Sequence, residues 1–261
     1  MFLVIALFCI PAILGAPNLK PLTPEQVERL KNWTEDDKQN IWELSGQTEG
    51  DMVLDVDQRN GLINERYRWS NNEIPYVLDS KFDDDEVAWI DKALEEYQEK
   101  TCLTVRKFQA GDTDYVYVTG EDSGCWSSVG RRGNRQTLNL QRGKLGEGCF
   151  RTGTIVHEFL HAAGFYHQQS ATERDDYVEI VWENIQSGTE NNFAKHAADV
   201  ITNFGEPYDY GSVLHYGAYA FSKNGEKTII TLDPEAEIGQ RYGMSEIDVN
   251  KVNIMYGCGK K

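Results

Sequence analysis

Three of the five histidines of this chain lie in one short window, from His157 to His167, and this window constrains the fold more than any other feature. Apolar residues at helical spacing predict a buried helix over residues 152–163. His157 and His161 are four residues apart, so both side chains lie on one face of that helix. Gly164 can adopt a left-handed conformation, end the helix and turn the chain back towards the same point.

The spacing of these residues predicts a zinc site with a general base beside it. Neutral imidazoles are good zinc ligands, so His157, His161 and His167 are the candidate ligands of one Zn²⁺ per chain. Glu158 is angled beside the ion, where it can take a proton from water whose pKa zinc lowers from about 15.7 to about 7. The short motif arises by chance in about one chain in a hundred, and Gly164 with His167 makes coincidence about a thousandfold rarer. We therefore expect hydrolysis by zinc-activated water.

The N-terminus predicts export from the cell. Residues 2–14 form an apolar run of about 13 residues, whereas a bilayer-spanning helix needs about 20. We interpret residues 1–16 as a signal peptide, with a buried core segment as the alternative. No later stretch approaches spanning length, so we expect a secreted, extracellular product with no membrane association.

The charge balance excludes one large class of partners. The chain has 26 basic and 42 acidic residues and a formal net charge of −16, which argues against nucleic acid. An apolar content of 40% excludes wholesale disorder. The length of 261 residues allows one large domain, or one domain with a smaller segment.

Four cysteines remain once Cys9 leaves with the signal peptide: Cys102, Cys125, Cys149 and Cys258. An even number in an exported chain predicts two disulfides, for which three connectivities exist. The glycine-rich stretch between Cys125 and Cys149 favours their pairing, which would leave Cys102 for Cys258. None lies in a Cys-x-x-Cys pair, so neither a thiolate zinc site nor a redox motif is expected.

Residues 17–59 differ from the rest in their pattern of apolar and polar residues. Thr23, followed by Pro24 and by Gln26 at the third helical position, predicts the start of a helix. Asn32 begins a sequon and is a candidate glycosylation site. Because large apolar residues follow no clear period here, we interpret the segment as a propeptide that is removed by cleavage. The alternative is a docked N-terminal extension that stays.

The remainder has the pattern of a packed domain with both strands and helices. Apolar residues within 74–78, 115–118 and 138–140 predict strands. Spacings of three and four between residues 87 and 97 predict an amphipathic helix. The acidic residues 83–86 in front of it are expected to cap the helix rather than to bind calcium.

The zinc motif and its surroundings resemble the astacin family of metzincin zinc endopeptidases. The further matching segments are Arg68-Trp69 with Ile74-Pro75-Tyr76, Gly124 to Gly130, Asp175 to Val178, and Ser212 to Gly217. The resemblance implies an α+β, two-lobed catalytic domain over residues 60–261, with a mixed sheet and a long zinc-binding helix. It implies cleavage of internal peptide bonds in protein substrates. We expect a short form without accessory C-terminal modules, acting as a monomer.

The resemblance also implies roles for residues outside the motif. Tyr216 would be a weaker further zinc ligand that moves off the metal to stabilise the oxyanion of the reaction. Asp51 would occupy the zinc in a zymogen in place of water. An activating protease would cut between Arg59 and Asn60. The implied disulfides are Cys102–Cys258 and Cys125–Cys149.

The sequence departs from the family pattern without losing a predicted ligand or the base. Leu214 stands in place of a methionine that packs beneath the zinc site, an exchange that costs under about 1.5 kcal/mol. Gln168 replaces a glutamate that anchors the freed N-terminus, so it can accept a hydrogen bond but brings no charge. Ala171 and Glu173 replace an arginine and an aspartate, and Thr48 replaces the phenylalanine of the propeptide motif.

Two other functions fit the same residues. One is a non-catalytic secreted binding protein that keeps the zinc site as structure, which the exchanges at Gln168 and Leu214 motivate. The other is a different class of zinc protease, with a glutamate from a later helix as third ligand. The two histidines outside the motif are expected to play minor parts, His215 in packing near the site and His196 at the surface.

Overall fold

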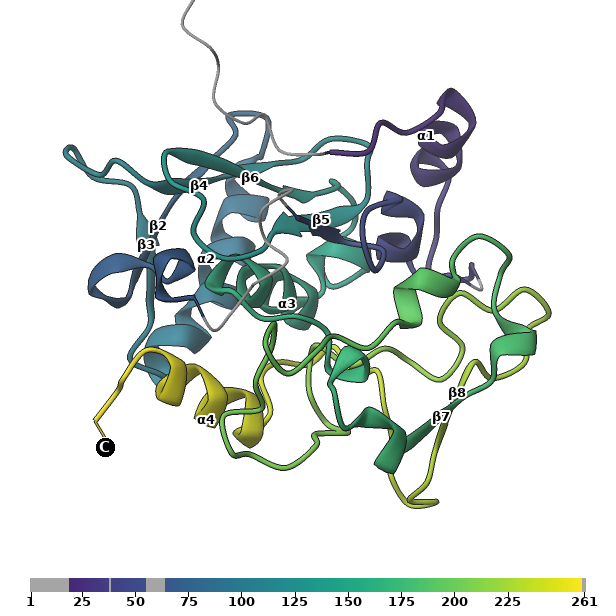
Figure 1. The fold of residues 1–261 in the computed structure, drawn as a ribbon. Coiled ribbons are helices and arrows are strands. Elements are labelled where there is room, and N and C mark those ends of the chain that lie inside the picture. The colour runs from purple at the N-terminus through teal and green to yellow at the C-terminus, as the bar shows by residue number, and fades with distance from the viewer. Residues whose placement is uncertain (1–18, 38, 55–63, 260–261) are drawn as a thin grey trace, which may run out of the picture.

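The computed structural model of this chain describes residues 19–37, 39–54 and 64–259 (Figure 1). The predicted signal peptide over residues 1–16 and the predicted cleavage site at Arg59-Asn60 lie outside these ranges. Within them, no helix combines the length and the apolar character that crossing a bilayer requires.

A mixed six-stranded sheet forms the upper lobe in Figure 1, in the order β1-β5-β6-β4-β2-β3. β5 runs antiparallel to β6, and every other neighbouring pair is parallel. The three strands that the apolar pattern predicted are β2, β4 and β6. The bounds are β1 Met52–Val53, β2 Glu73–Leu78, β3 Thr104–Lys107, β4 Tyr115–Thr119, β5 Cys125–Ser128 and β6 Arg135–Leu140.

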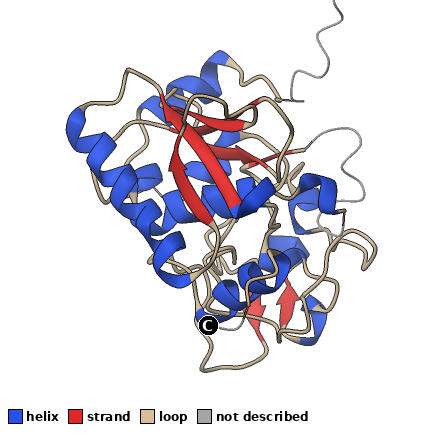
Figure 2. Cartoon of the chain, turned by 90° about the vertical axis from the view of Figure 1, so that its left-hand side faces the viewer, coloured by secondary structure: helices blue, strands red, loops and turns tan. Residues whose placement is uncertain are grey.

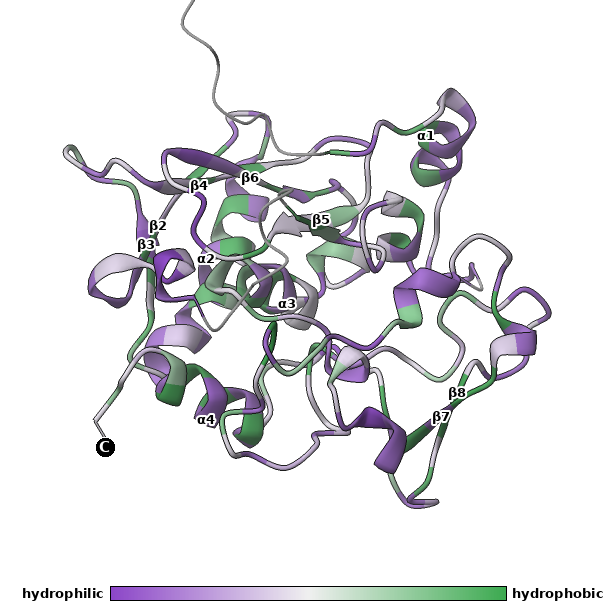
Figure 3. Cartoon of the chain, viewed as in Figure 1, coloured by the Kyte–Doolittle hydropathy of each residue, from purple (hydrophilic) through white to green (hydrophobic). Residues whose placement is uncertain are grey.

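Two long helices, α2 (Asp84–Lys100) and α3 (Thr152–Ala163), pack against the sheet and against each other (Figure 2). The N-cap Asp83 accepts from the Glu86 amide in a reciprocal capping box, which confirms the capping role of the acidic cluster. α3 has the predicted bounds, and from Gly153 onward every residue is buried. In Figure 3 α3 carries hydrophobic and hydrophilic residues together, so this buried helix brings polar side chains into the interior.

The lower lobe, from residue 164 onward, is less regular and consists mainly of loops and short 3₁₀ turns (Figure 1). Its regular elements are the antiparallel pair β7 (Val178–Ile180) and β8 (Ile229–Thr231) and the helix α4 (Glu246–Met255). Within the described residues the short helices are η1 Ile41–Ser45, η3 Glu65–Tyr67, η4 Ser70–Asn72, η5 Gly148–Phe150, η6 Gln168–Ser170, η7 Arg174–Asp176, η8 Trp182–Asn184 and η9 Glu190–Phe193.

Two disulfides connect these parts, with the pairing that the resemblance implied. Cys102, between α2 and β3, is bonded to Cys258 after α4. Cys125 at the start of β5 is bonded to Cys149 in η5. The first bridge therefore joins the two lobes, and the second fixes β5 near the start of α3.

The N-terminal segment 19–54 is docked on the domain. Its helix α1 (Pro24–Lys31) has the predicted capping box between Thr23 and Gln26. Trp42 in η1 and Met52 in β1 are buried in the common core. β1 extends the sheet by pairing in parallel with β5, so the segment covers the edge of the sheet next to α3.

Candidate metal centre and catalytic site

Three imidazole rings converge at α3 and the loop after it. His157 and His161 lie one helical turn apart, and their Nε2 atoms are 3.0 Å apart. Gly164 ends the helix with a φ of 116°, and the returning chain places His167 Nε2 at 3.4 Å from His157 Nε2. In tetrahedral coordination with Zn–N distances of about 2.0–2.1 Å, two ligand nitrogens are about 3.3–3.4 Å apart. The spacing of the rings therefore fits a zinc ion.

The hydrogen bonds of the rings leave their Nε2 lone pairs directed at a common centre. Nδ1 of His157 lies 2.8 Å from the Val213 carbonyl oxygen, and Nδ1 of His161 lies 2.7 Å from that of Phe165. Because a carbonyl oxygen only accepts, Nδ1 carries the proton in both rings. Two unprotonated Nε2 atoms 3.0 Å apart repel unless a cation lies between them, so the donor set fits a metal.

The fourth member of the cluster is Asp51, from the N-terminal segment. Its Oδ2 lies 3.1 Å from His157 Nε2, and its Oδ1 lies 3.2 Å from His167 Nε2 and 3.5 Å from His161 Nε2. Asp51 is fully buried, and the four candidate ligand atoms all lie within 4.8 Å of one another. Three imidazoles and one carboxylate match the ligand number and ligand types of zinc.

Glu158 lies beside the first ligand and has no direct partner. Both of its carboxylate oxygens are buried and accept no hydrogen bond from the described residues. Such an orphaned buried group is costly and marks a functional position. Burial raises the pKa of Glu158 well above its usual range, the Asp51 charge raises it further, and Arg241 opposes both. A raised pKa favours the uptake of a proton by this carboxylate.

Tyr216 lies next to the cluster and is held by the N-terminal segment. Its hydroxyl donates to the backbone oxygen of Glu49 at 2.6 Å, and its ring centroid is 4.8 Å from that of His167. Trp42 packs on Tyr216 with 4.8 Å between ring centroids and on Phe221 with 5.7 Å. The indole of Trp42 therefore covers the phenol for which the sequence predicts a catalytic role.

Glu49 supplies a third buried carboxylate, for which the sequence predicted no role. Its Oε2 lies 2.9 Å from His167 Nδ1 and accepts from Ser170 Oγ at 2.9 Å. Its Oε1 lies 2.6 Å from Nε2 of His196, which is half-buried rather than at the surface. Burial alone would raise the pKa of Glu49, but the hydrogen bonds from His167 and His196 hold it at about 2. Glu49 is therefore an ionised, buried acceptor.

Arg241 brings a positive charge to the same site. Its Nη1 donates to the His215 carbonyl oxygen at 3.0 Å, and the guanidinium lies 5.9 Å from the centroid of the Trp42 ring. Burial lowers the pKa of Arg241 to about 10, while the charges of Asp51 and Glu158 act in the opposite direction. Arg241 thus offsets part of the negative charge around the histidine cluster.

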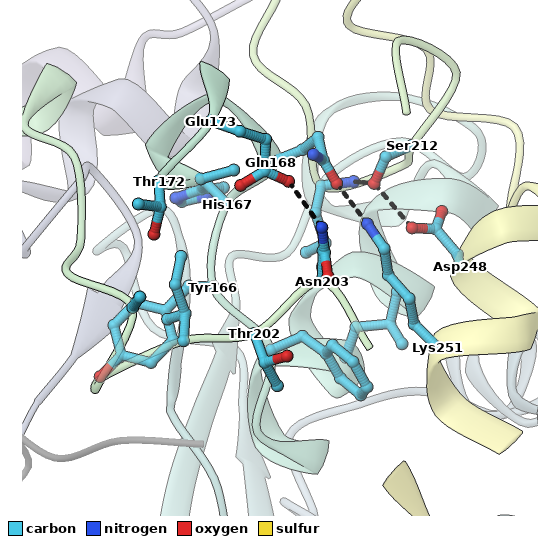
Figure 4. A pocket seen from close by; sticks show the side chains of 16 residues that line it. Tyr166, His167, Gln168, Thr172, Glu173, Thr202, Asn203, Ser212, Asp248 and Lys251 are labelled. Atoms are coloured by element: carbon cyan, nitrogen blue, oxygen red, sulfur yellow. Dashed lines mark hydrogen bonds between the residues drawn. The ribbon is translucent and has the colours of Figure 1, made fainter. Parts of the chain in front are cut away.

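A cavity of about 350 Å³ lies beside His167 and is lined by residues of both lobes (Figure 4). Gln168 Oε1 accepts from Lys251 Nζ at 2.6 Å, and burial lowers the pKa of Lys251. The amide oxygen that could have received the Asn60 amine is therefore bonded to an ammonium group of α4. Asn60 itself lies outside the described residues.

The two residues before Tyr216 are both buried. Leu214 lines the cavity beside His167, and its carbonyl oxygen accepts from the Gln168 amide. His215 packs as expected, with Nε2 2.7 Å from the Tyr208 hydroxyl and Nδ1 2.8 Å from the Tyr216 carbonyl oxygen. His215 is therefore satisfied without a metal.

Trp42, Glu49 and Arg241 belong to this site but were not predicted from the sequence. Trp42 carried a usable signal, because it lies with Ile41 and Leu44 in a short apolar cluster within a mostly polar segment. Glu49 lies two residues before Asp51 with Gly50 between them, a spacing that suits a turn presenting two carboxylates. Arg241 lies in a loop, and no local pattern indicates that it faces the histidines.

Known proteins share both the sequence and the fold. A family model described as "Astacin (Peptidase family M12A)" matches residues 61–257. The zinc metalloproteinase nas-4 of Caenorhabditis elegans is 41% identical over 230 residues, which cover 82% of this chain and 70% of the relative. The structure of high choriolytic enzyme 1, a hatching enzyme zinc-protease from the medaka Oryzias latipes, matches with a TM-score of 0.67 and 40% identity, covering 74% of this chain and 94% of that one.

Other relatives are much longer than this chain. Human meprin A subunit beta is 45% identical over 214 residues, which cover 80% of this chain and 29% of the relative. Zinc metalloproteinase nas-13 of Caenorhabditis elegans is 43% identical over 201 residues, covering 77% of this chain and 43% of the relative. The chain thus spans less than half the length of these two proteins.

Proposed function

The chain belongs to the astacin family, peptidase family M12A, and on this premise we propose that it is a secreted zinc-dependent endopeptidase, made as a zymogen, that hydrolyses internal peptide bonds of proteins. One observation carries the proposal. Three imidazoles and Asp51 of the N-terminal segment meet within 4.8 Å, the ring of Tyr216 packs on His167, and Glu158 next to His157 has a buried carboxylate without a partner among the described residues.

Each residue of the site has a distinct role in hydrolysis. His157, His161 and His167 would hold Zn²⁺, a Lewis acid that polarises a carbonyl and lowers the pKa of water to about 7. Glu158 takes a proton from the attacking water and then gives it to the leaving amine, for which its buried carboxylate, with no hydrogen-bond partner among the described residues, is free. Tyr216 donates its hydroxyl hydrogen to the scissile carbonyl oxygen as negative charge develops there.

The position of the N-terminal segment supports latency. Asp51 lies within the histidine cluster, where the reacting group of a substrate would have to be. The Asp51 carbonyl oxygen accepts from the Ser127 amide at 2.8 Å, and that of Val53 accepts from the Val129 amide at 3.3 Å. The segment therefore covers the metal site, and the edge of the sheet beside it, at the same time.

Cleavage between Arg59 and Asn60 by a protease with basic specificity would separate the segment from the domain of residues 60–261. Secretion is supported by the apolar N-terminus and by the two disulfides, which form in oxidising compartments. Asn32 is exposed at the end of α1 and is accessible for glycosylation.

The test compares intact and processed full-length protein, secreted from eukaryotic cells, on internally quenched peptides. The intact chain is expected to be inactive, and cleavage after Arg59 is expected to release activity that a chelator abolishes. Intact protein as active as processed protein would refute latency. Processed protein that binds zinc but cleaves neither peptides nor casein would refute the peptidase and favour the zinc-containing binding protein.

A further inference from the structure

We propose that Gln169 is a positioning residue for hydrolysis, because its side-chain amide holds the backbone of Tyr216 and so sets the place from which the phenol acts. The inference rests on the proposed function and deepens it, since it assigns one more residue to the same site. Both residues belong to the domain that remains after the proposed cleavage, so the contact does not depend on the N-terminal segment.

The contact joins two segments that are remote in the sequence. Gln169 lies in η6, two residues after His167, and is fully buried. Its Oε1 accepts from the Tyr216 backbone amide at 3.2 Å, across 47 residues of chain. Because a backbone N–H only donates, the side-chain atom that faces it is the amide oxygen, and the orientation of the amide is fixed. The loop that carries the third histidine thus holds the segment that carries the phenol.

Gln169 is itself held in place by a buried cation. Its carbonyl oxygen accepts from Nη1 of Arg174 at 2.9 Å, and the same nitrogen donates to the Phe193 carbonyl oxygen at 2.8 Å. Arg174 is buried, and the Phe193 ring packs edge-on against the Tyr216 ring with 5.7 Å between centroids. The side chain that holds Tyr216 is therefore supported by further contacts, as the placement of a reacting group requires.

Removal of the N-terminal segment makes this contact more important. In the intact chain the Tyr216 hydroxyl donates to the backbone oxygen of Glu49 at 2.6 Å, and the indole of Trp42 packs on the Tyr216 ring. Both partners leave with the segment. The bond from the Tyr216 amide to Gln169 stays, so the base of the side chain remains fixed while the hydroxyl becomes free to meet a substrate.

Packing alone does not account for an amide at this position. The Nε2 atom of Gln169 is buried and has no hydrogen-bond partner among the residues that the structure describes. A buried donor without an acceptor is costly. Methionine is unbranched and of similar length, so it would fill the same space without that cost. The bond from Oε1 to the Tyr216 amide is the contact that an apolar side chain cannot make.

The hydroxyl of Tyr216 needs accurate placement to stabilise the oxyanion. A donor is effective when it lies about 2.7–3.1 Å from the position that the developing charge will occupy. A displacement of about 1 Å lowers a rate about 100-fold. Without the acceptor of Gln169, the Tyr216 amide loses its partner and the backbone that carries the phenol shifts. An interaction made only in the transition state changes kcat and leaves KM nearly unaltered.

The first test measures steady-state kinetics of processed enzyme with a quenched peptide. Gln169→Met is expected to lower kcat by about 10- to 100-fold, to change KM by less than about threefold and to leave the zinc content unchanged. Gln141→Met is the matched control, because Gln141 is also buried and its Oε1 also accepts from a backbone amide, that of Gly124 at 2.9 Å. Gln141 follows β6 in the upper lobe, so its loss is expected to change kcat by less than about twofold.

The second test is a double-mutant cycle with Tyr216→Phe, run at enzyme concentrations that quantify slow turnover. Loss of the hydroxyl is expected to lower kcat by about 100- to 1,000-fold, the usual effect of removing one oxyanion donor. Since Gln169 acts through that hydroxyl, adding Gln169→Met to Tyr216→Phe is expected to change kcat by less than about twofold. A merely structural role would instead give losses that multiply.

A second variant covers the case in which Gln169→Met does not fold, as judged by thermal unfolding. Gln169→Asn keeps the amide but shortens the side chain by one methylene, so Oε1 no longer reaches the Tyr216 amide. It is expected to give the same fall in kcat and the same lack of further effect in the Tyr216→Phe enzyme.

The outcomes separate the two proposals. If processed wild-type enzyme cleaves no peptide, the proposed function fails. If it cleaves the peptide but the variants at Gln169 keep kcat within about threefold of the wild type, the positioning role alone is refuted. Loss of zinc from these variants, losses that multiply with Tyr216→Phe, or an unchanged kcat in Tyr216→Phe itself would refute that role as well.

Discussion

Replacing Trp42 with alanine is expected to raise the activity of the uncleaved chain. The indole is 5% exposed and packs on Tyr216 and Phe221. The backbone of the turn rests directly on it, since a Cβ atom at Gly50 would lie 2.9 Å from the indole ring. Truncating a buried tryptophan to alanine costs about 3–5 kcal/mol.

This cost weakens the docking of residues 41–53 more than it weakens the fold, because most residues of the common core and both disulfides belong to the catalytic domain. An equilibrium constant changes tenfold for about every 1.4 kcal/mol. The fraction of molecules with the segment displaced therefore rises by about two to three and a half orders of magnitude. The activity of the intact chain rises in proportion, up to the limit set by processed enzyme.

The assay measures hydrolysis of a quenched peptide by intact protein carrying Arg59→Gln, which removes the predicted cleavage site, with and without a chelator. Trp33→Ala is the matched control. Trp33 belongs to the same segment and is half-buried, but it packs beside Gly148, away from the histidines. The reasoning is refuted if Trp42→Ala leaves the intact chain silent, or if Trp33→Ala releases as much activity.

Three further predictions test the site and the packing around it. Glu158→Gln is expected to abolish hydrolysis while elemental analysis still finds about one zinc per chain, because the amide cannot take up a proton; normal turnover would contradict the role of base. Gly153→Ala is expected to lower the free energy of unfolding by about 2 kcal/mol or more, since its Cβ would lie 2.1 Å from the Arg241 backbone. Thermal unfolding should show no such loss for Gly143→Ala, where nothing lies within 4 Å, and equal losses would contradict the packing argument. Leu214→Met is expected to change the free energy of unfolding by less than about 1.5 kcal/mol in denaturant titrations, and a larger change would mean that the buried side chain is not interchangeable.

Local sequence patterns predicted the parts of this molecule that local physics determines. The helix of residues 152–163 followed from apolar spacing, and its end at Gly164 followed from the conformational freedom of glycine. The caps at Thr23 and Asp83 followed from side chains that bond to amides three residues away. The metal ligands could be predicted for the same reason, because His157 and His161 share one helical face.

Contacts between distant segments could not be predicted from local sequence patterns. Glu49 meets His167 and His196 across 118 and 147 residues of chain, and no periodicity links these positions. His196 therefore looked like a surface residue. The bond between Lys251 and Gln168 also joins remote segments, so the sequence indicated only that Gln168 carries no charge. Such pairings depend on how loops without regular structure pack, and propensity does not encode that.

The sequence has no cysteine between Cys9 and Cys102, so neither disulfide ties residues 19–54 to the rest of the molecule. Before cleavage, the linker keeps Asp51 near the histidines at a high effective concentration. After cleavage that advantage is lost, and rebinding becomes a bimolecular encounter whose rate falls with dilution. In an extracellular fluid the freed peptide diffuses away, so exposure of the histidine cluster would be effectively irreversible. Because no disulfide holds the peptide, a change in redox conditions would not return it to the site.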